Sequence, residues 1–203
     1  TKEEDSNFPE NIEETLAAAE DPQIPKNIEE TLAVICPGNN KLIGLGIILD
    51  ADQKETPEAR FNKIREDIKK LNFVTELPIG PGEVALGQPH CGIFIMPDNL
   101  KAGTLEDLLI ECAERSYPSL LQGTHQFLSC IDPLVLQLPK RDRKDFQKPA
   151  GRNKVIVGSL ANVFRPGKSV QVSIHDNGWV TADTVKLPRL AKFDKFLQDL
   201  FSL

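Results

Sequence analysis

Two apolar runs that each end on acidic residues are the features that most constrain how this chain folds. LIGLGIILDAD begins at Leu42, and CGIFIMPDN begins at Cys91. A segment that is apolar at successive positions is buried on both faces, which is typical of a strand inside a parallel sheet. We therefore predict strands at 42–49 and 91–96 that belong to one sheet.

Helical patterns alternate with these strands. PEARFNKIREDIKKLN follows the first strand, and TLEDLLIECAERS follows the second, with Thr104 as its N-cap and acidic residues in its first turn. Between them, the Gly/Pro-rich stretch 77–90 is predicted to be a loop or a hairpin. Further helices are predicted at 118–133, 152–164 and 189–201. This alternation predicts an α/β fold with a mostly parallel sheet flanked by helices, and ligands at the carboxyl ends of the strands.

Residues 1–40 form an acidic N-terminal segment that contains an internal duplication. PENIEETLAAAEDPQI is followed directly by PKNIEETLAVICPGNN, so NIEETLA recurs at a spacing of 16 residues. Each copy has a proline, an asparagine N-cap, early glutamates and two apolar residues four positions apart, which predicts short amphipathic helices at 10–20 and 26–36. We expect this segment to precede a single α/β domain at 41–203.

The net charge of −6 is unevenly distributed along the chain. Residues 1–30 contain ten acidic and two basic residues, a balance of −8, which leaves +2 for residues 31–203. KRDRKDFQKPAGRNK (140–154) holds seven bases and two acids. Such a segment is either a solvated loop or a contact for nucleic-acid phosphates. The bases that the second interpretation assigns to phosphate binding are Lys140, Arg141, Arg143, Lys144, Arg152 and Lys154.

The composition is ordinary for a soluble globular protein, with 40% hydrophobic and 27% charged residues. No apolar run approaches the roughly 18–20 residues that a membrane span needs, and no secretory signal is recognisable. Four cysteines are scattered without a CxxC pair, which favours reduced thiols. We therefore predict a cytoplasmic protein without a membrane partner. A chain that begins with Thr1 is expected to be a processed product or a fragment.

The acidic residues beyond the two strands are the candidate site. If the strands are parallel neighbours, Asp50 and Asp98 emerge at the same edge of the sheet, with Asp52 on the next loop and Glu106 and Asp107 opening the following helix. Converging carboxylates repel one another unless a cation binds or some take up protons, and oxygen ligands suit Mg²⁺ or Mn²⁺. Each of these acids also has an ordinary alternative role as a turn or helix cap. Both interpretations stay open at this point.

Several motifs together resemble a known family. ILDAD, PEARFNKIREDI, PGEVALG, GIFIMPDN with GTLEDLL, and RPGKSVQ with FDKFLQDLF look like the Toprim-related domain of unknown function 3226. The resemblance covers about residues 27–203, and the order and spacing of ILDAD and IMPDN-x4-TLEDLL are its most specific part.

This resemblance implies a Toprim-like fold whose DxD carboxylates bind Mg²⁺, which places the metal on Asp50 and Asp52. It also places Asp98, Glu106 and Asp107 near them as acids of the family pattern. Toprim-like chains begin with a strand that runs into a Glu-Gly motif, whose acid serves as general acid and base. Residues 1–40 contain neither that strand nor that motif, so no residue is assigned as catalytic.

Three functions are compatible with these features. The first is Mg²⁺-dependent cleavage of phosphodiesters, in which the metal bridges the carboxylates and a phosphate oxygen while bases from 140–154 hold the backbone. The second is a catalytically silent binding or interaction module, in which the duplicated helices cover the sheet or a partner. The third is a Mg²⁺-dependent phosphatase or phosphotransferase with Asp50 as nucleophile. Whether the chain is an enzyme, its substrate and its oligomeric state are not decided by the sequence.

Overall fold

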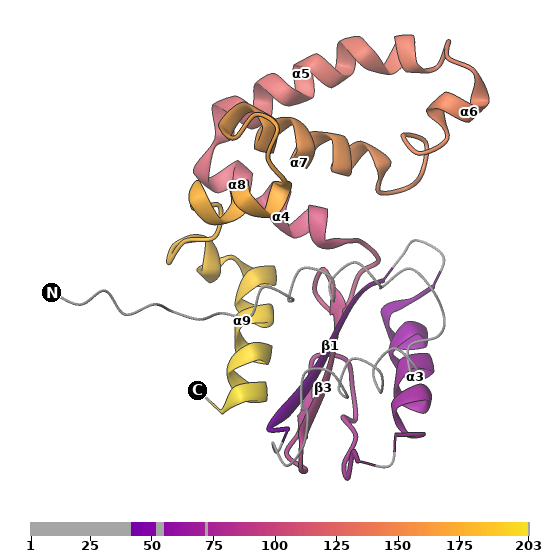
Figure 1. Cartoon of the computed structure of the whole chain (residues 1–203), viewed down its shortest axis with the longest axis vertical. Coiled ribbons are helices and arrows are strands. Elements are labelled where there is room, and N and C mark those ends of the chain that lie inside the picture. The colour runs from indigo at the N-terminus through magenta and orange to yellow at the C-terminus, as the bar shows by residue number, and fades with distance from the viewer. Residues whose placement is uncertain (1–41, 52–54, 72, 203) are drawn as a thin grey trace, which may run out of the picture.

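The computed structural model describes residues 42–51, 55–71 and 73–202 (Figure 1). Asp52 and the predicted helices at 10–20 and 26–36 lie outside the described residues. In chain order, the elements are β1 (Gly44–Asp50), α3 (Pro57–Ile68), β2 (Val84–Ala85), β3 (His90–Met96), α4 (Leu105–Ser116), α5 (Pro118–Val135), α6 (Lys140–Arg143), α7 (Gly151–Phe164), α8 (Val170–Asp176), the 3₁₀ turn η1 (Thr184–Lys186) and α9 (Pro188–Phe201).

The sheet has three strands in the order β1-β3-β2. β1 and β3 are parallel neighbours, with Asp50 opposite Met96, so the condition on which the candidate site rests is met. β2 pairs with β3 in the antiparallel sense, because the Gly/Pro-rich stretch 77–90 returns beside β3 as a short hairpin arm. The sheet is therefore mixed and small rather than mostly parallel, while the α/β class is confirmed.

Each face of β3 has its own core, because successive strand residues point to opposite sides of the sheet. On one side, Cys91, Ile93 and Ile95 pack with β1 residues and with α3. On the other side, Phe94 and Met96 pack against α9, where Phe94 meets the ring of Phe196 at 5.3 Å between centroids. α3 and α9 therefore cover opposite faces of the sheet (Figure 1). Because β3 is buried on both faces, its sequence is apolar at successive positions.

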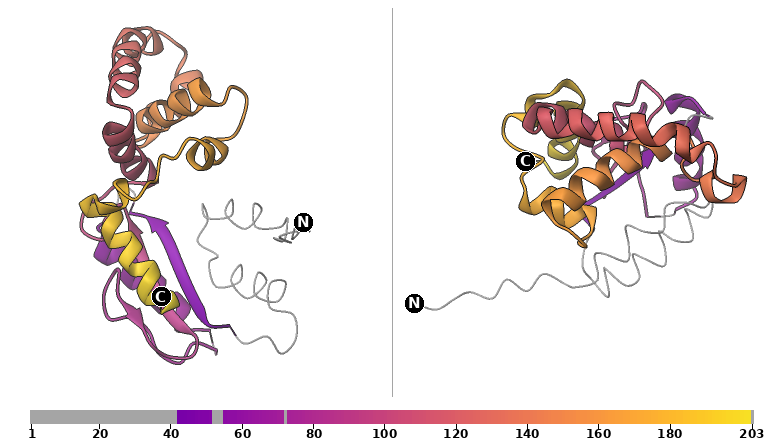
Figure 2. Two further views of the ribbon diagram at one scale, coloured as in Figure 1. Left: turned by 90° about the vertical axis from the view of Figure 1, so that its left-hand side faces the viewer. Right: turned by 90° about the horizontal axis from the view of Figure 1, so that it is seen from above.

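The helices from α4 to α8 form a second body, here called the helical lobe, beyond the carboxyl ends of the parallel strands (Figure 2). α5 and α7 pack on α4, α8 packs on α7, and the four helices share a core with the buried Trp179. The prediction that helices flank the sheet thus holds for α3 and α9 but not for these. α4 serves both cores: its Leu108 and Cys112 face the sheet side, and its Leu109 and Ala113 face the helical lobe.

Several predicted boundaries are confirmed. α4 begins directly after Thr104, α7 spans the predicted 152–164 within one residue, and the C-terminal helix docks as expected. α5 runs two residues past Pro133, within the usual variation of helix ends. α6, α8 and η1 were not predicted, since each is too short for a periodic pattern. Among the described helices, none combines the length and apolarity that a membrane crossing needs.

Two glycines of α7 give a matched test of this packing. A Cβ at Gly151 would lie 2.2 Å from the carbonyl oxygen of Asp145, whereas a Cβ at Gly158 would have no atom within 4 Å. We expect Gly151→Ala to lower the free energy of unfolding by about 1–3 kcal/mol, because backbone must move. Gly158→Ala should raise it by about 0.5–1 kcal/mol through helix propensity. Urea denaturation of both variants measures this, and equal effects would contradict the fold of α7.

Candidate ligand-binding cleft at the carboxyl end of the sheet

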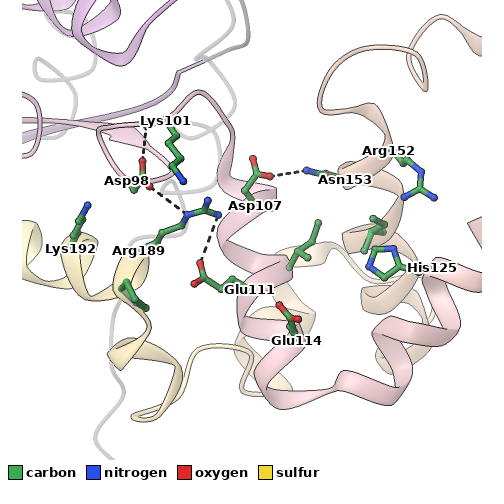
Figure 3. Close-up of a pocket in the computed structure, with 13 residues that line it drawn as sticks. Asp98, Lys101, Asp107, Glu111, Glu114, His125, Arg152, Asn153, Arg189 and Lys192 are labelled. Carbon is green, nitrogen blue, oxygen red and sulfur yellow. Dashed lines mark hydrogen bonds and ion pairs between the residues drawn. The ribbon is translucent and has the colours of Figure 1, made fainter.

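A cavity of about 600 Å³ lies where the sheet meets the helical lobe (Figure 3). Its walls come from the loop after β3 and from α4, α5, α7 and α9, so segments from across the chain contribute. We call this cavity the cleft. Its charged and polar lining residues are Asp98, Lys101, Asp107, Glu111, Glu114, His125, Arg152, Asn153, Arg189 and Lys192.

Asp98 is the most deeply buried charge of the cleft, with 6% of its surface exposed. Its Oδ1 accepts hydrogen bonds from the backbone N–H groups of Leu100 and Lys101 at 3.0 and 2.9 Å, and its Oδ2 lies 3.6 Å from Nε of Arg189. Burial pushes the pKa of Asp98 up, but these two hydrogen bonds and the charges of Arg189 and Lys192 outweigh it, so the pKa is lowered. Asp98 is therefore a carboxylate at neutral pH.

Arg189 connects three elements at this point. Besides Asp98, its guanidinium pairs with Glu111 of α4, with 3.9 Å between Nη1 and Oε2. That Glu111 oxygen is buried and has no hydrogen-bond partner among the described residues. One arginine on α9 thus balances the negative charges of two acids, one from the loop after β3 and one from α4 (Figure 3).

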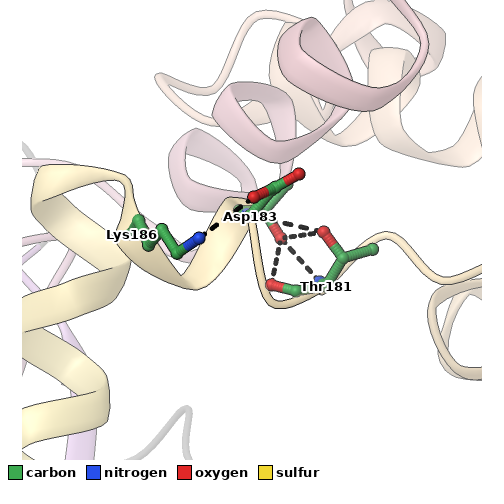
Figure 4. Close-up of polar contacts among 4 residues, drawn as sticks. Thr181, Asp183 and Lys186 are labelled. Carbon is green, nitrogen blue, oxygen red and sulfur yellow. Dashed lines mark hydrogen bonds and ion pairs between the residues drawn. The ribbon is translucent and has the colours of Figure 1, made fainter.

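The turn before α9 fixes where Arg189 enters the cleft. The backbone N–H of Thr181 donates to Oγ1 of Thr184 at 2.7 Å, and the N–H of Thr184 donates to Oγ1 of Thr181 at 3.2 Å (Figure 4). Lys186 and Asp183 form an ion pair at 3.2 Å on the outside of the same turn. Thr184 is fully buried. The reciprocal hydrogen bonds therefore hold η1 in place directly before α9 begins.

Asp107 holds α4 to α7. Its Oδ2 accepts the backbone N–H of Thr104 at 2.8 Å, which caps the start of α4. Its Oδ1 accepts the side-chain N–H of Asn153 at 2.9 Å. Both oxygens of this predicted metal ligand are therefore engaged with neutral donors, and the residue joins two helices of the helical lobe.

Asp50 and Glu106 do not line the cleft. Oδ1 of Asp50 accepts the backbone N–H of Leu105 at 3.0 Å, so the last residue of β1 caps the first turn of α4. Next to it, the N–H of Ala51 reaches the carbonyl oxygens of both Met96 and Gly103 at 3.2 Å. Glu106 stands one residue further along α4, and its buried Oε2 has no hydrogen-bond partner in the described part of the chain.

These contacts bear on the predicted metal site. Asp50, Asp98 and Asp107 each cap a turn or helix through backbone N–H groups, which is the ordinary role that the sequence left open for them. Within the residues that the structure describes, no group of three or more His, Cys, Asp or Glu side chains is arranged to hold a metal ion. The assignment of a metal to Asp50, Asp52, Asp98, Glu106 and Asp107 therefore stays a prediction.

The predicted phosphate-binding bases are distributed over two places. Arg152 lines the cleft and pairs with Asp132 at 3.2 Å. The remaining five, Lys140, Arg141, Arg143, Lys144 and Lys154, are not part of its lining, and α6 lies at the far end of the helical lobe (Figure 1).

Sequence reasoning missed Lys101, His125, Arg189 and Lys192 as lining residues of the cleft. The one local signal was the spacing of Arg189 and Lys192, which places both bases on one face of α9. The sequence could not show that this face meets the β3 loop.

Burial disfavours a nucleophilic role for Cys91. Burial raises the pKa of Cys91 to about 11, so the reactive thiolate is scarce at neutral pH. Cys91 faces α3, whereas Nδ1 of its neighbour His90 lies 3.1 Å from the carbonyl oxygen of Leu200 in α9. The two side chains therefore point to opposite faces of the sheet, as strand geometry requires.

Together, the fold and the cleft define a small mixed α/β protein with a helical lobe and a charged cleft at the carboxyl edge of its parallel strands. The chain belongs to the family described as protein of unknown function DUF3226, whose sequence model matches residues 4–202. No curated protein and no solved structure matches the chain.

The central ion pair gives a pH-dependent prediction. Because the pKa of Asp98 is lowered by folding, its contribution to stability is present above the ordinary aspartate pKa of about 3.9 and is lost as pH falls through the folded value. We expect Arg189→Gln to reduce the free energy of unfolding by about 1–2 kcal/mol at pH 7, since Asp98 and Glu111 lose their cation. The difference from wild type should shrink between about pH 5 and pH 2.

Lys195→Gln is the matched control on the same helix. It removes one base from an exposed ion pair with Asp199 at 2.8 Å, so its cost should stay below about 0.5 kcal/mol. Urea denaturation across pH measures both variants. A cost for Arg189→Gln that equals the control, or that does not change with pH, would show that Arg189 does not compensate the buried acids.

Proposed function

We propose that this protein is a binding module whose cleft holds the phosphates of a nucleic-acid strand. The observation that carries the proposal is the convergence of Lys101, Arg152, Arg189 and Lys192 on one cavity at the carboxyl end of parallel strands. Open α/β sheets bind their ligands at this edge. Phosphate oxygens are the acceptors that a group of lysines and arginines recognises best.

The lining of the cleft holds four acids and four lysines or arginines, and its two lysines are available to an anionic ligand. The acids beside Arg189 are already compensated, Asp98 by backbone N–H groups and by Arg189, and Glu111 by Arg189. In the described part of the chain, Lys101 and Lys192 form no ion pair, although Lys192 contributes to the lowered pKa of Asp98. Two ammonium groups are thus available to an incoming anion.

Arg152 favours a strand over a small phosphate. It lines the cleft and also belongs to the basic segment 140–154, which holds seven bases and two acids. A polymer with regularly spaced phosphates contacts such an extended distribution, whereas a single phosphate uses one end of it. Asp50, Asp98 and Asp107 each accept backbone N–H groups that cap a turn or helix, which supports binding rather than catalysis as the main role.

A fluorescently labelled single-stranded 12-mer tests this proposal. We expect binding that weakens with salt, because bound counterions are released from the phosphates. Lys101→Gln/Lys192→Gln should weaken binding by about tenfold at low salt and reduce the slope of log K against log salt by about 1.4, or 0.7 for each lost contact. Fluorescence anisotropy gives both quantities.

The control variant for this test is Lys69→Gln/Lys70→Gln, which removes the same charge from the C-terminal end of α3, outside the cleft lining. It should leave the salt slope within about 0.3 of wild type, because neither base is near the proposed phosphates. Equal losses in both double variants would mean that the strand is held by overall charge alone and would refute the cleft as its site.

Metal-dependent phosphodiester cleavage of the Toprim type is the second candidate. It is favoured by Glu106, whose buried Oε2 lacks a hydrogen bond from the described residues, beside the point where Asp50 caps α4. A buried carboxylate oxygen without a donor is satisfied by a cation or a proton. Mg²⁺ or Mn²⁺ on Asp50, Asp52 and Glu106 would supply charge stabilisation at a phosphate. The phosphatase hypothesis gains less, since an oxygen of its nucleophile Asp50 is engaged by Leu105.

Thermal unfolding with Mg²⁺ and Mn²⁺ separates this candidate from simple binding. If the acids hold a metal, millimolar Mn²⁺ should raise the Tm of wild type by about 2–4 °C, corresponding to about 1 kcal/mol. Asp50→Asn/Asp52→Asn should lose that response, while the amide oxygen introduced at position 50 keeps the cap on Leu105. Asp194→Asn, an exposed acid of α9, is the control. A response that persists in the double variant would place the ion elsewhere.

A further inference from the structure

The end of the helical lobe around α6 carries exposed apolar and basic side chains together. Phe127 and Leu134, seven residues apart on one face of α5, are 54% and 56% exposed, and Leu136 and Leu138 in the following turn are 58% and 46% exposed. Basic residues follow at once on α6 and the segment after it. We call this surface the α5–α6 tip; its members are Phe127, Leu134, Leu136, Leu138, Lys140, Arg143 and Lys144.

The positive charge of the tip is largely uncompensated by its own acids. Asp142 and Asp145 pair with Arg141 and Lys148 at 3.1 and 2.7 Å. Among the described residues, no carboxylate forms an ion pair with Lys140, Arg143 or Lys144, although Arg143 donates a hydrogen bond to the carbonyl oxygen of Leu136. The tip therefore offers three cations beside four apolar side chains.

The acidic N-terminal segment 1–30 has the complementary chemistry. The net charge of residues 1–30 is −8, and that of residues 140–154 is +5. These are the two segments in which acidic and basic residues are most unequal in number. The copies of NIEETLA combine acids with apolar residues at a spacing of four, which is the pattern of an amphipathic helix with one acidic and one apolar face. Such a helix matches both features of the tip at once.

We propose that residues 1–30 dock on the α5–α6 tip and compete there with nucleic acid for the basic segment 140–154. The proposed competition with nucleic acid rests on the proposed function, whereas the proposed docking of residues 1–30 does not. Four exposed apolar side chains contribute nothing to a phosphate backbone, but they bury area against an amphipathic helix. For this reason an acidic helix fits the tip better than a nucleic acid does.

The covalent connection favours the segment of the same chain. The described residues begin at Leu42, and the 21 residues between the first predicted helix, 10–20, and Leu42 span up to about 70 Å when extended, so this helix can reach surfaces well away from the start of β1. A tethered partner acts at an effective concentration up to the millimolar range, and weak ionic and apolar contacts then suffice for docking. Salt weakens the ionic share of these contacts.

A spin label on Cys130 tests the docking directly. Cys130 is exposed and shares the α5 face of Phe127 and Leu134, while Cys91 and Cys112 are buried. In a Cys36→Ser background, we expect at least a twofold loss of amide NMR signal intensity within residues 1–30, and recovery in 1 M NaCl or in Lys140→Glu/Lys144→Glu. The control carries the label on α3, in Cys36→Ser/Cys130→Ser/Lys69→Cys, and should leave residues 1–30 unaffected.

Two outcomes would overturn the docking. One is unchanged signal intensity in residues 1–30 with the label at Cys130. The other is equal loss when spin-labelled chains without isotope are mixed with isotope-labelled chains without spin label, because the segment would then come from a second copy.

Oligonucleotide affinity tests the competition separately. Neutralising the five acids Glu10, Glu13, Glu14, Glu20 and Asp21 to their amides in the full chain should tighten binding of the 12-mer about tenfold at low salt, and less at high salt. Neutralising Glu55, Glu58, Glu66, Glu76 and Asp67 is the control of equal charge outside the segment. An equal gain in both would refute the competition. If the spin label at Cys130 reduces the amide NMR signals of residues 1–30 but the protein does not bind the oligonucleotide, the docking is supported and the proposed function is refuted.

Discussion

The structure depends on a small group of hydrogen bonds at the end of β1. The N–H of Ala51 reaches the carbonyl oxygens of Met96 and Gly103, so one donor joins β1, the end of β3 and the loop that leads into α4. The carboxylate of Asp50 completes the arrangement by capping α4 at Leu105. Since the helical lobe is built on α4, its position relative to the sheet, and with it the shape of the cleft, follows from these contacts.

The acidic and the basic side chains of the cleft have different roles. Cations that converge on one cavity repel each other, and Asp98 and Glu111 reduce that repulsion around Arg189. The backbone N–H groups that hold Asp98 keep it ionised despite burial. The acids therefore allow Arg189 to lie beside Lys101 and Lys192, which remain available to a ligand. A sequence with several acids around one cavity need not mark a metal centre.

Local patterns explain which parts of the fold could be predicted. Uninterrupted apolar runs identified β1 and β3, and Thr104 with its following acids identified the start of α4, because strand burial and helix capping act over a few residues. For residues 77–90 the sequence left a loop and a hairpin open, because a two-residue strand has no period of its own, and the structure shows the hairpin, with β2 paired to β3.

The site was predicted less well, for a related reason. The order of strands and acids correctly placed Asp50 at the end of β1 and Asp98 just beyond β3, at one edge of the sheet. It could not tell that Asp98 would turn toward α9 while Asp50 turned to the backbone of α4, since both choices depend on residues distant in sequence. Arg189, more than 90 positions from Asp98, illustrates how long-range packing decides which carboxylates meet.

The sharing of α4 between two cores has a consequence for how the molecule comes apart. Leu108 and Cys112 on one side and Leu109 and Ala113 on the other alternate along a single helix, so neither core keeps its full wall without it. Loss of α4 from one core exposes apolar surface of the other at the same moment. The sheet and the helical lobe, which look separable in outline, are therefore coupled into one cooperative unit whose least exchangeable amides lie in the helix between them.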